Sequence, residues 1–124
     1  MNKIYHLGNC TTCHAIFKET GIDTVQKRFR MQDIKFEKIT PAQLDEMKKM
    51  TGSYEALFSR RAMKYKEWGL KDKKLEEKDY RQFILDEYTF LKRPVVINVD
   101  RIFVGNEKKT RAALKLAVKN INVV

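Results

Sequence analysis

Two kinds of hydrophobic spacing alternate along the chain. Short apolar runs bounded by Gly, Asn or Asp are typical of strands, and apolar residues three or four positions apart are typical of helices. The expected strands are residues 3–7, 25–30, 94–99 and 101–104, and the expected helices are residues 11–20, 41–51, 54–68, about 76–90 and 112–121. The polar residues 70–79 predict a linker between the third and fourth of these helices.

Helix ends are marked most clearly in the middle of the chain. Thr40 is expected to be an N-cap, Pro41 takes the first helical position, and Gln43 completes a capping box. Gly52 is expected to end this helix, and Ser53 is expected to cap a continuous helix that runs to Gly69.

The strand predicted at residues 25–30 rests on alternation alone. Val25, Lys27 and Phe29 would share one face, and the basic Arg28 and Arg30 would share the other. By contrast, the strand at residues 94–99 is almost wholly apolar, so it is expected to lie centrally in a sheet.

The order of these elements predicts an α/β fold. A strand, a cysteine motif, a helix and a strand come first, then several helices, then two strands and a helix. This order fits a thioredoxin-like mixed sheet flanked by helices, as one domain over residues 1–124 with a helical insertion at about residues 40–91.

Composition supports one folded domain. The chain has 124 residues, of which 43% are apolar, enough for a core without disulfide bridges. The first residues do not resemble a signal peptide, and no apolar run reaches the length of a membrane span. We therefore expect a reducing, cytoplasmic location and no membrane partner.

The chain is strongly basic, with a net charge of +10 from 26 basic and 16 acidic residues. Such a surface can attract anions, nucleic acid or an acidic protein face. The charges are dispersed and there is no helix-turn-helix or zinc-finger signature, so direct nucleic-acid binding is not favoured.

Both cysteines of the chain lie in Asn-Cys-Thr-Thr-Cys-His, residues 9–14. Cys10, Cys13 and His14 spell the attachment signature of a c-type haem, and His6 would complete four ligands for zinc. Haem is disfavoured because c-type haem is usually attached outside the cytoplasm, which calls for an export signal, and the first residues do not resemble one. Zinc is disfavoured because neighbours on a helix point about 100° apart. No metal or haem is therefore expected, and thiol–disulfide chemistry is the remaining interpretation.

The position of the cysteines suggests separate roles. Cys10 precedes a predicted helix, whose positive end and free N–H groups favour the thiolate, which is the nucleophile. Cys13 lies one helical turn deeper and could resolve a mixed disulfide or a thiol adduct on Cys10.

Nearly the whole chain resembles the arsenate reductase (ArsC) and Spx family of thioredoxin-like proteins. The similar residues include the C-x-x-C after the first strand and a histidine four residues before Cys10. They also include residues 57–61 and 65–70, which look like the family's insertion helices, and residues 92–97, Arg101 and residues 104–105, which look like its Arg-Pro strand and hairpin.

The resemblance implies a site around the cysteine pair. A cis Pro94 would bring Arg93 beside Cys10, where its guanidinium could hold an oxyanion or stabilise a thiolate. Arg60 and Arg61 are candidates for the same pocket, and His6 could tune Cys10.

Not every feature of the family is present. ArsC-type reductases that use glutaredoxin commonly have one essential cysteine and three arginines around the oxyanion. In this chain, Arg93 matches one arginine, another falls at Ser59 or Arg60, and the third position lies near Val104.

Two functions follow from the resemblance. The first is a cytoplasmic thiol–disulfide oxidoreductase that acts on arsenate or another small oxyanion. It would need no bound cofactor, because its electrons would come from glutathione and glutaredoxin or from thioredoxin. The second is an Spx-like regulator that binds RNA polymerase, with the cysteine pair as a redox switch.

Overall fold

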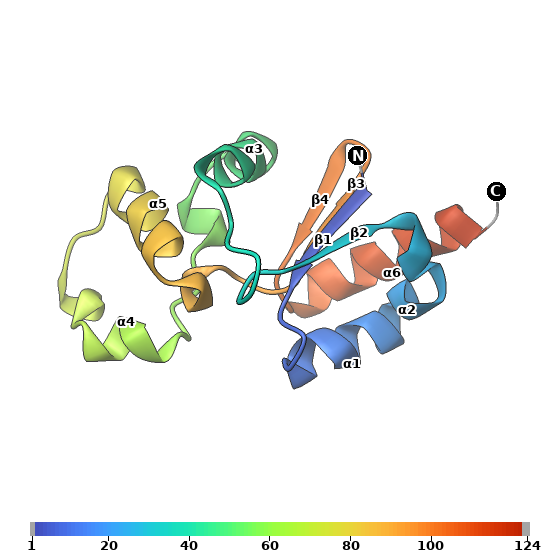
Figure 1. The fold of residues 1–124 in the computed structure, drawn as a ribbon, viewed down its shortest axis with the longest axis horizontal. Coiled ribbons are helices and arrows are strands. Elements are labelled where there is room, and N and C mark those ends of the chain that lie inside the picture. The colour runs from blue at the N-terminus through green and yellow to red at the C-terminus, as the bar shows by residue number, and fades with distance from the viewer. Residues whose placement is uncertain (1, 123–124) are drawn as a thin grey trace. The chain divides into compact units, whose positions relative to one another are not determined.

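A computed structural model describes residues 2–122 of the chain (Figure 1). Its elements are β1 (Asn2–His6), α1 (Thr11–Thr20), α2 (Ile22–Val25), η1 (Gln26–Arg28), β2 (Arg30–Asp33), α3 (Pro41–Thr51), η2 (Glu55–Leu57), α4 (Met63–Glu67), η3 (Leu70–Asp72), α5 (Glu77–Asp86), η4 (Tyr88–Phe90), β3 (Val95–Asn98), β4 (Arg101–Val104) and α6 (Lys108–Asn122), where η denotes a 3₁₀-helix. None of the helices among these residues is long and apolar enough to cross a membrane.

The chain forms two compact units. The first combines the residues up to Phe36 with those from Arg93 onward, and the second is Glu37–Lys92. The first unit holds the sheet and both cysteines, and the second is helical.

A four-stranded mixed sheet organises the first unit, in the order β2-β1-β3-β4. Strand β1 runs parallel to β2 and antiparallel to β3, and β3 and β4 form a hairpin. Helices α1 and α6 lie side by side along one face of this sheet (Figure 1). Ile4, Val96 and Phe103 of the sheet share a buried core with both helices. The predicted α/β, thioredoxin-like class is confirmed.

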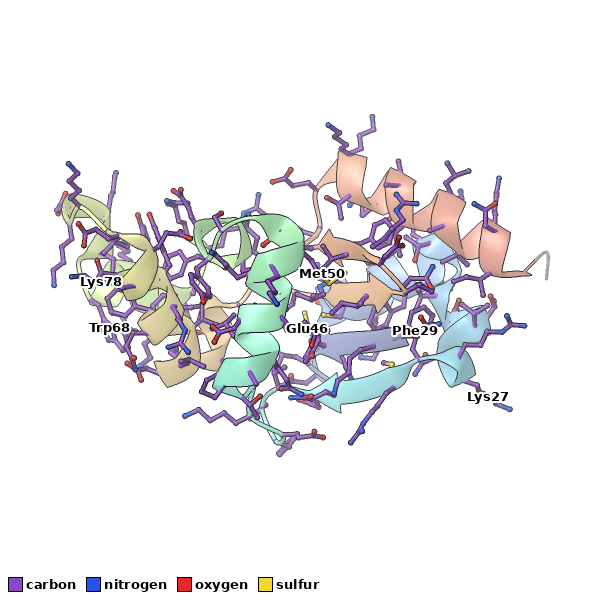
Figure 2. All side chains as sticks on the ribbon, turned by 90° about the horizontal axis from the view of Figure 1, so that it is seen from above. Lys27, Phe29, Glu46, Met50, Trp68 and Lys78 are labelled. Atoms are coloured by element: carbon purple, nitrogen blue, oxygen red, sulfur yellow. The ribbon has the colours of Figure 1, made fainter. Side chains whose placement is uncertain are left out.

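The predicted strand at residues 25–30 is wrong. Ile22, Val25 and Phe29 are buried in the core with α1 and α6, and their spacing of three and four residues suits helical turns. Lys27, expected on the same face as Phe29, points away into solvent (Figure 2). The strand begins only at Arg30, where pairing with β1 starts.

Helix α3 begins and ends where the sequence predicts. The Thr40 hydroxyl accepts a hydrogen bond from the Gln43 N–H, and the Gln43 side chain accepts one from the Thr40 N–H, both at 3.1 Å. Gly52 ends the helix with a φ of 94°, a left-handed conformation that glycine adopts without strain.

The continuous helix expected from Ser53 to Gly69 is broken. Phe58 is fully buried and extended, and its ring stacks on Phe90 with 4.9 Å between centroids. The Ser59 N–H donates to the Phe90 carbonyl at 2.7 Å, and the Lys92 N–H donates to the Leu57 carbonyl at 2.8 Å. These bonds require extended backbone, so only η2 and α4 remain helical.

The same pairing shortens the helix expected at about residues 76–90. Phe58 and Leu91 form an isolated β-bridge, so the chain must leave the helix before Leu91. Helix α5 therefore ends at Asp86, and η4 is a single 3₁₀ turn. The expected linker also contains structure, because Leu70 begins η3 and is buried.

Candidate active site

Cys10 lies at the junction between the loop after β1 and the first turn of α1. It is the N-cap of α1, with extended backbone, and its Sγ accepts a hydrogen bond from the Cys13 N–H at 3.4 Å. Its own N–H donates to the Leu7 carbonyl at 3.1 Å. Both thiols are free. Cys10 is half-buried and Cys13 is buried. The structure thus places the cysteine pair at the start of a helix, as the sequence predicts.

The surroundings of the two thiols shift their pKa values in opposite directions. Partial burial alone would raise the pKa of Cys10, but hydrogen bonds from the Cys13 backbone and side chain, together with the charge and hydrogen bonding of Arg93, hold that pKa below its ordinary value. For Cys13, burial and the hydrogen bond and charge of Cys10 raise the pKa to about 12. Cys10 is therefore the stronger candidate for the thiolate nucleophile.

Arg93 reaches the cysteines from the segment before β3. The Arg93–Pro94 peptide bond is cis, and Pro94 is buried. The Pro94 carbonyl accepts a hydrogen bond from the Gly105 N–H at 2.9 Å, which ties this segment to the end of β4. The structure thus brings Arg93 and both cysteines together within one unit, as the family resemblance implies.

The two histidines near the pair have different surroundings. The His6 ring packs edge-on against Phe17, with 6.2 Å between centroids. The His14 Nε2 lies 2.7 Å from the Gly8 carbonyl oxygen. Neither contact is to a cysteine, so the expected influence of His6 on Cys10 stays a prediction. Among the described residues, no group of three or more His, Cys, Asp or Glu side chains could hold a metal ion.

Arg60 and Arg61 belong to the second unit. Arg60 donates to the Glu55 carboxylate at 2.8 Å and to the Tyr80 hydroxyl at 3.0 Å, and its side chain remains half exposed. Arg61 lines an open hollow of about 660 Å³ together with Arg60, Met63 and Lys66. A role for either arginine in binding an oxyanion stays a prediction.

One residue next to the cysteine loop, Asp33, is not predicted from the sequence. Asp33, at the end of β2, accepts hydrogen bonds from the N–H groups of Gly8 at 2.9 Å and Lys35 at 3.1 Å. An Asp at the end of a strand that pairs with β1 is a signal in the sequence for such a contact. The strand was expected at residues 25–30, however, so Asp33 was not placed beside the loop.

The opposite pKa shifts of Cys10 and Cys13 predict how the labelling rate of each thiol depends on pH. Only the thiolate reacts with iodoacetamide, and the lowered pKa keeps Cys10 deprotonated at a lower pH than an ordinary thiol. The labelling rate of Cys10 should therefore reach half its maximum at a lower pH than that of an ordinary cysteine, whose pKa is ~8.5. The same protein unfolded in urea is the control and should show the ordinary midpoint. Faster labelling of Cys13 than of Cys10 would contradict the assignment.

A model of the ArsC family matches residues 5–114. Similar solved structures include an arsenate reductase from Vibrio cholerae, with a TM-score of 0.72 and 14% identity over 91% of this chain and 93% of that chain. A protein related to the ArsC family from Bacteroides fragilis has a TM-score of 0.74 and 19% identity over 91% of this chain and 96% of that chain. An ArsC-related protein from Brucella melitensis has a TM-score of 0.65 and 20% identity over 90% of this chain and 92% of that chain. No curated protein matches the sequence.

Proposed function

The chain belongs to the ArsC family, and we propose that it is a cytoplasmic thiol–disulfide oxidoreductase that works through Cys10 and Cys13. Its substrate would be arsenate or another small oxyanion that reacts with thiols. The observation that carries the proposal is the Cys10 thiol at the start of α1, with its pKa lowered by the hydrogen bonds from Cys13 and by Arg93. This combination supplies a nucleophile and a cation for an anionic substrate.

In the first step, the Cys10 thiolate attacks the arsenic(V) atom of arsenate. An S–As bond forms, and an oxygen of arsenate leaves as water after protonation. The guanidinium of Arg93 would hold the remaining oxygens, because its planar donors match an oxyanion. The positive N-terminal end of α1, where Cys10 is the N-cap, favours the same negative charge.

In the second step, the Cys13 thiolate attacks the Cys10 Sγ. An S–S bond forms, the S–As bond breaks, and its electron pair leaves with arsenic as arsenite. The two thiols are oxidised, and arsenic is reduced from (V) to (III). The charge of the Cys10 thiolate helps to raise the pKa of Cys13. That charge is lost in the adduct, so one cause of the raised pKa is removed and Cys13 deprotonates more easily, although its burial remains.

A reductant must then return the disulfide to two thiols. Thioredoxin can do this by dithiol exchange, and two molecules of glutathione can do it directly or through glutaredoxin. Each route supplies two electrons, so the cycle uses no bound cofactor.

An arsenate reduction assay with both electron donors tests this function. NADPH oxidation is followed with thioredoxin and its reductase, and separately with glutathione, glutaredoxin and glutathione reductase. We expect arsenate-dependent turnover with at least one donor system and none when Cys10 is replaced by Ser. Disulfide formation without arsenate turnover in either system would contradict arsenate as substrate.

The Spx-like regulator is the second candidate, and the same cysteine pair favours it. A pair that switches between two thiols and a disulfide can report the redox state without turning over a substrate. Binding of purified RNA polymerase to the reduced and to the oxidised protein tests this alternative. Redox-dependent binding would favour the regulator, and equal absence of binding in both states would exclude it.

A further inference from the structure

Gly8 in the loop before Cys10 is held through both of its backbone polar groups. Its N–H donates to the Oδ2 atom of Asp33 at 2.9 Å. Its carbonyl oxygen lies 2.7 Å from the His14 Nε2, which donates to it in the tautomer that carries the proton on Nε2. A loop residue two positions before the nucleophile is thus fixed by two side chains that the reaction itself does not use.

The two side chains anchor Gly8 to different elements. Asp33 ends β2 and is paired in register with His6 of β1, so it connects the loop to the sheet. Its second oxygen accepts from the Lys35 N–H at 3.1 Å, which fixes the carboxylate. His14 lies in α1 directly after Cys13, so it connects the same loop to the helix.

The fit around Gly8 is close. A Cβ atom on residue 8 would lie 2.8 Å from the Asp33 Oδ2, nearer than such atoms approach in proteins. The carboxylate could not move aside without losing its hydrogen bonds to the Gly8 and Lys35 N–H groups. With Asp33 in this place, only glycine fits at position 8 without displacing the carboxylate.

We propose that Asp33 and His14 are positioning residues, which hold Gly8 from the sheet and from the helix and thereby fix the Cys10 Sγ at the start of α1. This inference rests on the proposed function of Cys10 as a nucleophile. Asp33 and His14 act through the loop and do not touch the substrate.

We call Asp33, His14 and their two hydrogen bonds to Gly8 the clamp. The hydrogen bond from the Cys13 N–H to the Cys10 Sγ, which the clamp would hold in place, is sensitive to small displacements. The Cys10 Sγ lies 3.4 Å from the Cys13 nitrogen, and the Cys10 N–H donates to Leu7 on the other side of Gly8. Hydrogen bonds weaken steeply as distance and angle depart from ideal values. A freer loop would therefore weaken the bond from Cys13 and the interaction with Arg93, and the pKa of Cys10 would rise.

The sign of the effect at Asp33 separates positioning from simple electrostatics. A carboxylate disfavours a nearby thiolate, so loss of the negative charge alone would lower the pKa of Cys10. Loss of the clamp would raise it. Asp33→Ala is therefore expected to shift the pKa of Cys10 in the direction opposite to the charge effect.

The test measures the pH profile of Cys10 labelling by iodoacetamide, resolved by mass spectrometry. We expect Asp33→Ala and His14→Ala each to move the midpoint to higher pH and to slow labelling at pH 7 by about 3- to 10-fold, the effect of one hydrogen bond. Asp33→Asn keeps an acceptor for one N–H, and His14→Gln keeps a side-chain donor, so both should recover part of the rate. Asp23→Ala in α2 and Lys18→Ala in α1 are exposed charge controls and should leave the profile unchanged.

Each outcome decides the inference. Thermal unfolding identifies variants that have lost the fold, and His14→Ala, at an exposed position of α1, provides the test if Asp33→Ala does not fold. Folded variants with an unmoved midpoint, or a lower midpoint for Asp33→Ala, would overturn the clamp while the proposed function stands. An ordinary midpoint in the unmodified protein would overturn the proposed function, and this inference with it.

Discussion

Replacing Cys10 by Ser is expected to abolish oxyanion reduction, with a loss of kcat/KM of roughly 1000-fold or more. A serine hydroxyl at the start of α1 stays protonated at neutral pH and is a far weaker nucleophile than a thiolate. The substitution exchanges one sulfur atom for an oxygen at a half-buried position, so the protein should remain folded. The measurement is steady-state turnover with the thioredoxin and the glutathione donor systems.

Cys13→Ser is the matched comparison, because it should stop the reaction one step later. Cys10 should still react with substrate or disulfide at close to its normal rate, since the Cys13 backbone N–H that supports its thiolate is retained. Without a resolving thiol, the adduct on Cys10 should accumulate and be visible by intact-protein mass spectrometry. Equal loss of the first step in both variants would show that the two roles have been assigned incorrectly.

Features set by neighbours in the sequence could be predicted from the sequence. The start of α1 after Cys10, its end at Gly21 and the capping box of Thr40 and Gln43 depend on residues within one or two turns. The class of the fold follows from the order of such elements. The cysteine pair, which is the centre of the candidate site, is also a local motif.

Features that depend on distant contacts could not be predicted. The break after Leu57 exists because Phe58 packs and pairs with Phe90 and Leu91, more than 30 residues away. The Arg81 guanidinium donates to both Asp45 oxygens, and with the Tyr54 hydroxyl it lowers the pKa of Asp45 to about 2. Neither contact leaves a pattern in hydrophobic spacing.

The candidate site shows the same division. Cys10 and Cys13 could be predicted because they are close in sequence and begin a helix. The role of Asp33 could not, because strand β2 begins at Arg30 rather than at Val25. Arg93 was predicted through the family resemblance, not through local spacing. Its contribution to the pKa of Cys10 arises from a segment more than 80 residues away.

Arg93→Ala is expected to slow the reaction of Cys10 with an anionic substrate by roughly 10- to 150-fold, the effect of a charge-assisted hydrogen bond. The positive charge and hydrogen bonding of Arg93 favour the thiolate, so their removal should raise the pKa of Cys10 and move the labelling midpoint to higher pH. Arg93→Lys should recover only part of the rate, because a single ammonium replaces the planar set of donors. The measurements are the pH profile of labelling and the rate with arsenate.

Arg101→Ala is the control for this prediction, since it removes the same charge from the same unit. Arg101 is exposed on β4, and its guanidinium lies over the Phe103 ring, 4.9 Å from the centroid. A general effect of net charge would slow both variants alike, whereas a specific contact with Cys10 would affect only Arg93→Ala.

Comparing the labelling rates of Arg93→Ala with neutral iodoacetamide and with anionic iodoacetate separates two contributions of Arg93. Activation of the thiolate should change both rates equally, and binding of the anion should add a further loss with iodoacetate. If Arg93→Ala changes neither rate, the anion-binding part of the mechanism is wrong, and a plain disulfide switch becomes the better explanation.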